Sequence, residues 1–114
     1  RWTAYHVRQI THSMVEMFRK RGFCFLEILS PCPTLYQRRN RLGDGLEAMK
    51  YYKEASVTRH GAPTKEVAIS FQGPILVGKF VDIERPTYLE LLNQQLARTL
   101  EAQYTGCIED HVRS

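Results

Sequence analysis

Hydrophobic and polar positions switch between helical and strand-like spacing along this chain. From about residue 6 to Arg21, apolar residues recur three and four positions apart, and Gly22 then interrupts the pattern. Residues 23–29 follow as an almost continuous apolar run of strand length, broken only by Glu27. We therefore predict a helix followed by a buried parallel strand, in which Glu27 would need a partner.

The next part of the chain predicts a second helix. The stretch Thr34–Leu42 is basic and irregular, so no regular element is expected there. Asp44 and Glu47 stand three residues apart and match a capping box, which predicts a helix running to about Ser56. The inner face of this helix is expected to carry Leu46, Met49 and either Tyr52 or Lys53.

The last part of the chain predicts a loop, a strand and a long helix. Residues 57–66 lack an apolar period and are expected to form an exposed loop. Ile75–Val81 has the composition of a second buried strand. A leucine stripe then predicts a helix from about Thr87 to Gln103, ended by Gly106.

This alternation of helices and strands indicates the α/β class. We expect few, mostly parallel strands with flanking helices, and we expect the strands at Phe23–Leu29 and Ile75–Val81 to be adjacent or nearly so.

Composition limits the size and the partners of the chain. With 114 residues, 43% of them hydrophobic, it has the length of a single domain or part of one, spanning residues 1–114. It contains no apolar stretch of membrane-spanning length and no signal-peptide pattern, so no membrane association is expected. The net charge of +4 is not arranged as a basic stripe interleaved with aromatics, which argues against a nucleic-acid partner. Three unevenly spaced cysteines form no disulfide framework and predict a cytoplasmic location.

Cys32 is the strongest candidate for chemistry. It lies between Pro31 and Pro33, directly after the first apolar run, and ligands of open α/β sheets gather where strands end. The alternative is an inert, buried cysteine on a rigid turn, because free cysteines are often buried. Cys24 stands between Phe23 and Phe25 and is expected to pack within the sheet.

Two blocks of sequence resemble a known enzyme subunit. Residues 22–34, followed by Arg38-Arg39-Asn40, resemble the β subunit of 2-oxoacid:ferredoxin oxidoreductases and are closest to the 2-oxoglutarate branch. Residues 75–88, with Asp82, Arg85 and Pro86, are similar to the strand, turn and last helix of that subunit. The opening residues 1–6 fit the stretch just past its thiamin-diphosphate site.

The resemblance implies the C-terminal part of a thiamin-diphosphate-binding fold. The family decarboxylates a 2-oxo acid, transfers the acyl group to coenzyme A and passes electrons singly through a 4Fe-4S cluster to ferredoxin, in complex with an α subunit. Thiamin diphosphate binds there with Mg²⁺. Cys32 stands at the position of one of four cluster ligands, and the other three have no counterpart in this sequence. We therefore expect part of a longer subunit, with no catalytic residue of its own, which is inactive and cofactor-free in isolation.

Several assignments stay open at this stage. Arg38 and Arg39 could hold the distal carboxylate of the substrate or a coenzyme A phosphate, or they could belong to a solvated loop. Gly43-Asp44-Gly45 copies the start of a magnesium signature, but we assign Asp44 to helix capping because the required asparagine is missing. The Pro-Cys-Pro segment is expected to offer few amide donors to a cluster and so to keep its potential low. The alternative function is a non-catalytic α/β interaction module in which Cys32 is a relic.

Overall fold

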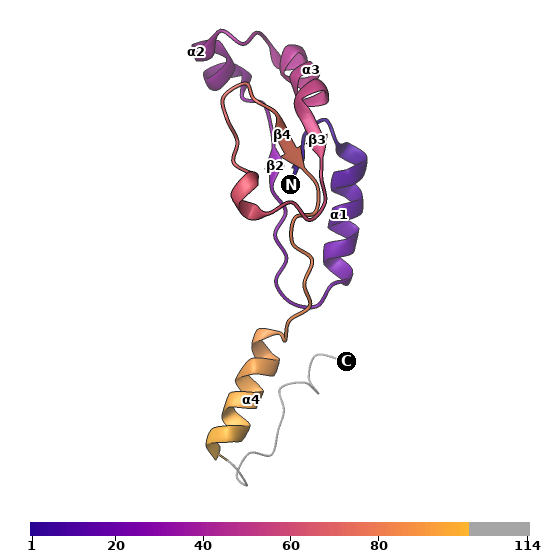
Figure 1. Cartoon of the computed structure of the whole chain (residues 1–114), viewed down its shortest axis with the longest axis vertical. Coiled ribbons are helices and arrows are strands. Elements are labelled where there is room, and N and C mark those ends of the chain that lie inside the picture. Colours follow the sequence, from indigo (N-terminus) through magenta and orange to yellow (C-terminus); the bar gives the residue numbers. More distant parts are fainter. Residues whose placement is uncertain (101–114) are drawn as a thin grey trace. The chain divides into compact units, whose positions relative to one another are not determined.

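The structure is a computed structural model that describes residues 1–100. These residues divide into two compact units, of which the first comprises Arg1–Arg19 and Phe25–Asp82 and the second comprises Lys20–Cys24 and the chain from Ile83 onward. The chain contains helices and short strands, and the strands form two parallel pairs (Figure 1). This confirms the α/β class. The predicted helix end at Gln103 and the stop at Gly106 lie outside the described residues.

The first unit begins with a strand, a helix and a second strand. These are β1 (Trp2–Thr3), α1 (Val7–Arg19) and β2 (Ile28–Leu29). The two strands are parallel, with Trp2 opposite Ile28, so α1 is the crossover connection that parallel neighbours require. The predicted helix is confirmed, and Gly22 has the positive φ, 96°, that suits a residue after a helix end.

The predicted strand over residues 23–29 is mostly wrong. Only Ile28 and Leu29 are paired, because β1 offers a ladder of just two residues. Phe23 is 90% exposed and Phe25 is 77% exposed, so the apolar run does not mark a buried strand in the described chain. Glu27 does have a partner, as expected, since Arg1 Nε donates to its Oε2 at 2.6 Å.

A second parallel pair follows the helix α3. Its members are α3 (Gly45–Ala55), β3 (Ser56–Thr58) and β4 (Ile75–Val77). Because β3 pairs with β4 from Ser56 to Thr58, the expected loop over 57–66 is wrong at its start. That tract also holds the buried Ala62 and a short 3-10 helix, Thr64–Glu66. A three-residue strand is too short to show a period in the sequence.

The second predicted strand is confirmed in part. It ends at Val77 rather than at Val81, because Gly78 leaves the strand conformation with a φ of 135°. Gly78 instead exchanges two hydrogen bonds with Arg1: its N–H donates to the Arg1 carbonyl at 2.8 Å and its carbonyl accepts from the Arg1 ammonium at 2.9 Å. This link joins β4 to the start of β1. The two predicted strands are therefore near neighbours, with β1 between them.

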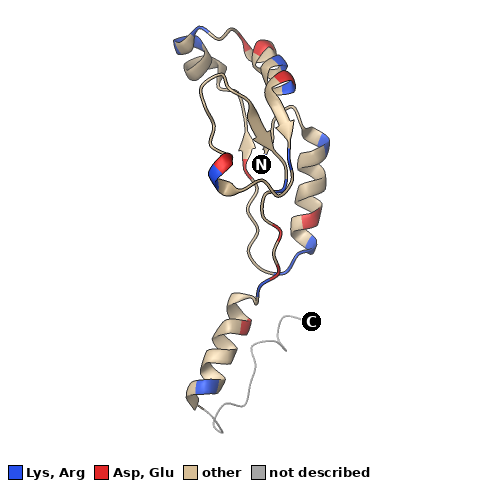
Figure 2. Ribbon diagram, viewed as in Figure 1, with Lys and Arg blue, Asp and Glu red and all other residues tan. Residues whose placement is uncertain are grey.

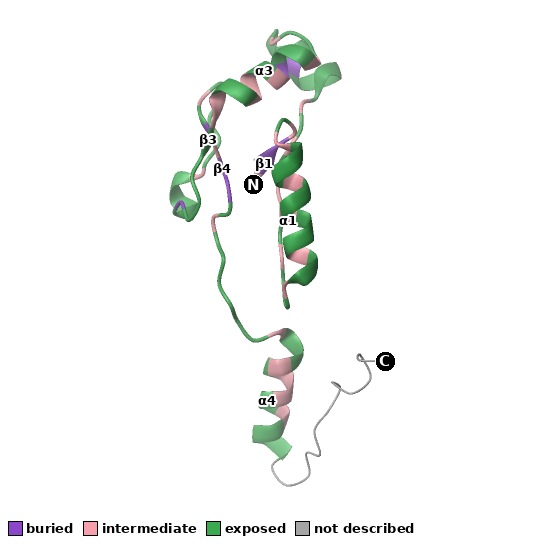
Figure 3. Cartoon of the chain, turned by 90° about the vertical axis from the view of Figure 1, so that its right-hand side faces the viewer, coloured by how far each residue is buried: buried purple, intermediate pink, exposed green. Residues whose placement is uncertain are grey.

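The core lies where the two strand pairs meet. Trp2, Ile75 and Val77 form it, and Val77 is fully buried. Figure 3 shows buried positions in purple on β1 and β4. Partly buried residues packed against this cluster are Ile10, Leu26, Leu29, Tyr51 and Tyr52. The indole Nε1 of Trp2 donates to Ser13 Oγ at 2.8 Å, which fixes α1 against the core. No residue of α1 is buried, so its outer side is open to solvent.

The segment expected to be irregular, Thr34–Leu42, is helical for most of its length. A π-helix spans Pro33–Gln37 and continues as α2 (Arg38–Asn40), which ends at Arg41 in a left-handed conformation. The prediction failed because this segment has no apolar period, whereas its turns are held by backbone bonds and by the Asn40 side chain, which donates to the Tyr36 carbonyl at 2.8 Å.

The predicted helix after Asp44 is confirmed, including its capping box. Its inner face agrees with the prediction in part: Met49 and Tyr52 are half-buried as expected, whereas Leu46 is exposed. Ala48, which is buried, and Tyr51, which is half-buried, were not predicted there. Positions three and four apart share a helix face, so Ala48, Tyr51 and Tyr52 form one stripe toward the core.

The second unit is built around α4 (Tyr88–Leu100). Thr87 and Glu90 form a reciprocal cap at its start: the Thr87 N–H donates to Glu90 Oε2 at 2.6 Å and the Glu90 N–H donates to Thr87 Oγ1 at 3.3 Å. Arg21 pairs with Glu90 at 3.1 Å. Within the described residues, no helix has the length and apolar character needed to cross a bilayer.

Candidate functional site

The Cys32 loop connects β2 to the π-helix. Cys32 immediately precedes Pro33, whose missing N–H costs nothing at the start of a helix because that donor would be unpaired there. The Gln37 N–H donates to the Cys32 carbonyl at 3.1 Å, the five-residue spacing of a π-helix. Cys32 is exposed, which contradicts the alternative of a buried cysteine, and its role as a ligand stays a prediction.

The first amides of the π-helix act on the Cys32 sulfur. The backbone N–H of Tyr36, then that of Leu35, and the Thr34 side chain lower the pKa of the thiol below its ordinary value. The side chain makes no full capping hydrogen bond, so these contacts are weak ones. The Pro-Cys-Pro segment itself offers few amide donors, because Pro31 and Pro33 have none, and its effect on a cluster potential stays a prediction.

Cys24 has a different environment. It is partly buried, but no strand includes it and its neighbours Phe23 and Phe25 are exposed, so the predicted packing of Cys24 within the sheet is wrong. No strand forms at these positions, because β1 pairs only with Ile28 and Leu29. Cys32 is thus the more accessible of the two cysteines in the described chain.

The basic segment lies directly after the cysteine loop. Arg38 and Arg39 are exposed on α2, as is Arg41 just after it. Figure 2 shows basic residues in blue on the ribbon of this part of the chain. Within the described part of the chain, neither Arg38 nor Arg39 forms an ion pair. Their role toward a substrate carboxylate or a coenzyme A phosphate stays a prediction.

The Gly43-Asp44-Gly45 turn serves α3. Asp44 Oδ1 accepts from the N–H groups of Leu46 and Glu47 at 2.9 and 3.0 Å, and Glu47 Oε2 accepts from the Asp44 N–H at 2.9 Å. This confirms the assignment of Asp44 to capping. Among the described residues, no group of three or more histidine, cysteine or acidic side chains is placed to hold a metal ion.

One residue escaped the sequence analysis. Gln37 is only 3% exposed and contacts the Cys32 loop on one side and the Asp44 turn on the other. Burial of a single glutamine leaves no periodic signal in a polar stretch, so only its position five residues after a candidate cysteine could have drawn attention to it.

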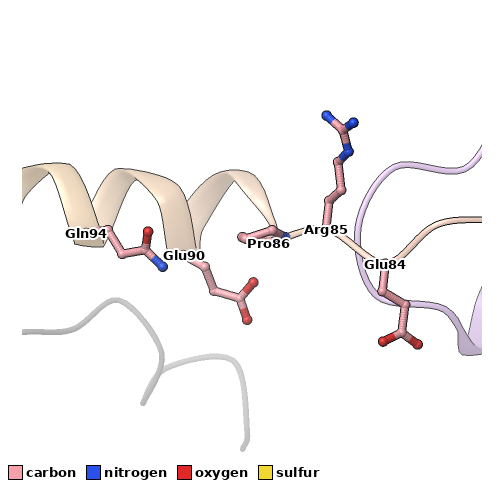
Figure 4. A pocket seen from close by; sticks show the side chains of 5 residues that line it. All are labelled: Glu84, Arg85, Pro86, Glu90 and Gln94. Atoms are coloured by element: carbon pink, nitrogen blue, oxygen red, sulfur yellow. The ribbon is translucent and has the colours of Figure 1, made fainter.

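A surface depression of about 510 Å³ lies in the second unit. Glu84, Arg85, Pro86, Glu90 and Gln94 line it (Figure 4). It is open to solvent rather than enclosed, and Glu90 already caps α4, which lowers the pKa of its carboxyl through the Thr87 N–H and hydroxyl and through Arg21. The depression therefore has the features of a helix start more than of a ligand site.

This chain can supply one ligand, Cys32, to an iron-sulfur cluster. A 4Fe-4S cluster takes four cysteine thiolates, and the described chain offers the exposed sulfur of Cys32 with amides directed toward it. The sulfur thus has the accessibility and the thiolate character of a cluster ligand. The remaining ligands would have to come from outside this chain segment.

Three curated proteins similar to this chain are subunits named KorB of 2-oxoglutarate synthase. The chain is 40% identical over 86 residues to the 2-oxoglutarate synthase subunit KorB of Methanothermobacter marburgensis, covering 75% of this chain and 30% of that protein. It is 35% identical over 99 residues to KorB of Methanocaldococcus jannaschii, covering 86% and 36%. KorB of Methanothermobacter thermautotrophicus is 33% identical over 105 residues, covering 89% and 36%.

The chain thus spans about a third of the length of these curated relatives. No protein-family model matches it. No solved structure matches it at a significant level.

Proposed function

This chain is a homologue of part of the KorB subunit of 2-oxoglutarate synthase, and we propose that it is a segment of an enzyme that oxidatively decarboxylates 2-oxoglutarate. The observation that carries the proposal is the 33–40% identity to three KorB subunits over 75–89% of the chain. The α/β architecture and the accessible Cys32 support it.

The proposed reaction consumes the 2-oxo acid and coenzyme A and yields carbon dioxide and an acyl-coenzyme A. Its two electrons reduce two ferredoxins, one electron each, after passing through a 4Fe-4S cluster. Thiamin diphosphate, held with Mg²⁺ outside this segment, supplies the carbanion chemistry of decarboxylation. The complete subunit works with an α subunit.

Within this scheme, Cys32 is one of the four cluster ligands. Its position at the carboxyl end of β2 puts the sulfur at the edge of the sheet, and the Leu35 and Tyr36 amides favour the thiolate that iron requires. Hydrogen bonds to cluster sulfurs raise the reduction potential, so these amides would tune the cluster upward.

Arg38 and Arg39 are proposed to hold an anionic group of a substrate. A guanidinium can bind a carboxylate or phosphate through two parallel hydrogen bonds, and both side chains are exposed and without ion pairs in the described chain. Alanine variants should raise the KM for 2-oxoglutarate or for coenzyme A. If neither KM changes, both binding roles are discarded.

Co-production of the complete subunit with its α subunit tests the function. We expect a brown protein that reduces ferredoxin or methyl viologen only when 2-oxoglutarate and coenzyme A are both present. Cys32→Ser should lose cluster iron and electron transfer, whereas Cys24→Ser should keep both. A colourless, stable assembly without this activity would instead support a non-catalytic α/β interaction module.

A further inference from the structure

Gln37 is a buried polar residue in a segment that is otherwise exposed. It is 3% exposed, whereas its neighbours Tyr36 and Arg38 are open to solvent. Burying an amide side chain is unfavourable unless its polar atoms find partners. The contacts that offset this cost therefore indicate what the residue does.

Three hydrogen bonds of Gln37 connect it to Cys32 on one side and to Leu42 and Asp44 on the other. Its backbone N–H donates to the Cys32 carbonyl at 3.1 Å, and its carbonyl accepts from the Leu42 N–H at 3.0 Å. Its side-chain Nε2 donates to the Asp44 carbonyl at 2.6 Å. The side chain thus connects the turn that begins at Cys32 to the turn that begins α3.

The Asp44 end of this connection is fixed independently. Asp44 caps α3 through two backbone N–H groups and receives a reciprocal bond from Glu47. Gly45, the first residue of α3, lies close to the Pro33 ring, which would be 3.8 Å from a Cβ at that position. Gln37 therefore attaches the cysteine loop to the start of a well-capped helix.

The Gln37 side chain acts through its donor alone. Its Oε1 is buried and has no hydrogen-bond partner within the described residues. An unpaired buried oxygen is unfavourable, so the Nε2 bond to Asp44 is the contact that compensates for the burial. Gln37→Met would keep most of the volume of the side chain, and it would remove both this donor and the unpaired oxygen.

We propose that Gln37 is a positioning residue for Cys32: it holds the π-turn that begins at Cys32 closed against the start of α3, and so fixes the position of the sulfur proposed to bind the cluster. The effect on the cluster rests on the proposed function, whereas the closure of the turn by Gln37 does not depend on it. When the Asp44 bond is lost, the turn opens more often and the sulfur is held less firmly in one position. The surroundings of this cluster ligand then change, and the reduction potential of the cluster shifts.

Two measurements on the assembled enzyme test the proposal. Hydrogen exchange with mass-spectrometric detection should show exchange about tenfold faster in residues 33–37 of Gln37→Met, the change expected for loss of one hydrogen bond. Redox titration followed by electron paramagnetic resonance should show a cluster midpoint potential that differs from that of the wild type. A purely structural role would lower the thermal midpoint without moving the cluster potential.

Ser56→Ala is the matched control. Ser56 also has a buried side-chain oxygen without a partner in the described chain, but it belongs to β3 rather than to the cysteine loop. This variant should leave both the exchange of residues 33–37 and the cluster potential unchanged. If Gln37→Met does not assemble, Gln37→Asn keeps an amide on a shorter side chain and should shift both quantities in the same direction by less.

The possible outcomes distinguish a failure of the positioning role of Gln37 from a failure of the proposed function. Unchanged exchange in residues 33–37 would overturn the positioning role whatever the enzyme does. Faster exchange with an unchanged midpoint potential would also overturn it, because the loop would then be held without any effect on the ligand. If the wild-type assembly contains no cluster, the proposed function fails, and the exchange data alone decide whether Gln37 closes the turn.

Discussion

At the scale of single residues, the environment of Cys32 predicts its reactivity. The Tyr36 and Leu35 amides lower the pKa of its thiol, and the side chain is exposed. Cys24 is partly buried. Because the thiolate is the reacting form, iodoacetamide near pH 7.5 should alkylate Cys32 several-fold faster than Cys24 in the native chain. Peptide mass mapping over a time course measures both rates, and faster labelling of Cys24 would contradict the assignment.

Glu16 gives a prediction for the effect of pH. Its carboxylate accepts a hydrogen bond from the Lys79 ammonium, which holds the pKa of Glu16 below its ordinary value. A lowered folded-state pKa stabilises the fold above the pKa of the unfolded chain, and this stabilisation is lost as the pH falls through the folded-state pKa. Glu16→Gln should therefore lower the thermal midpoint at pH 7 and change it little at about pH 3.

Glu54→Gln serves as the control for this experiment. Glu54 is exposed on α3 and forms no ion pair within the described residues. Its substitution should have little effect at either pH. An equal loss of stability at both pH values for Glu16→Gln would show that packing, and not the ion pair, is responsible.

At the scale of elements, α3 depends on its capping box. Asp44 satisfies two N–H groups that the helix itself leaves unpaired. Asp44→Ala should lower the free energy of unfolding by about 1 kcal/mol, the usual loss for an N-cap. Urea titration followed by circular dichroism measures this loss. Lys50→Ala, on the exposed side of the same helix, should change the stability by much less.

The end of β4 requires glycine. Gly78 has a φ of 135°, and a Cβ there would lie 3.2 Å from the Arg59 carbonyl oxygen and 3.3 Å from His60 Nδ1. Gly78→Ala should therefore cost roughly 1 to 3 kcal/mol in unfolding free energy. Gly61→Ala is the matched control, because Gly61 also has a positive φ but nothing within 4 Å of its Cβ position. Equal losses in the two variants would show that the steric contact at Gly78 is unimportant.

Elements with local sequence signals were predictable, and those that depend on distant partners were not. The Asp44 box and the Gly22 stop fix helix ends through neighbouring atoms, so both were identified from sequence. The apolar run at residues 23–29 gave the wrong length for β2, since strand length is set by β1 and not by the run itself. Gln37 was missed because its burial comes from Asp44, which is seven residues away.

At the scale of the whole molecule, apolar side chains remain on the surface. Val7, Met14 and Phe18 lie on one side of α1, next to the side that meets the core through Ile10, and Phe18 is 89% exposed. Figure 3 shows this largely exposed helix. The chain corresponds to about a third of its curated relatives, so a surface that contacts other parts of a complete subunit would be open here.

We therefore expect the 114-residue chain to self-associate. Phe18→Ser should weaken this association at least several-fold without lowering the thermal midpoint, because Phe18 adds almost nothing to the core. Analytical ultracentrifugation over a range of concentrations measures the effect. Leu46→Ser, which changes an exposed leucine on α3, is the control. A chain that stays monomeric at high concentration would contradict this expectation.

The contact between Arg1 and Gly78 has a consequence for the order of folding. The two parallel strand pairs close short loops, of about 26 and 19 residues, whereas this contact spans 77 residues. Closing the longer loop costs about 1.2 kcal/mol more chain entropy than closing the shortest. Each strand pair can thus form before the two are joined, and the joint forms last. Substitutions at Gly78 should then speed unfolding in stopped-flow experiments while leaving the folding rate almost unchanged.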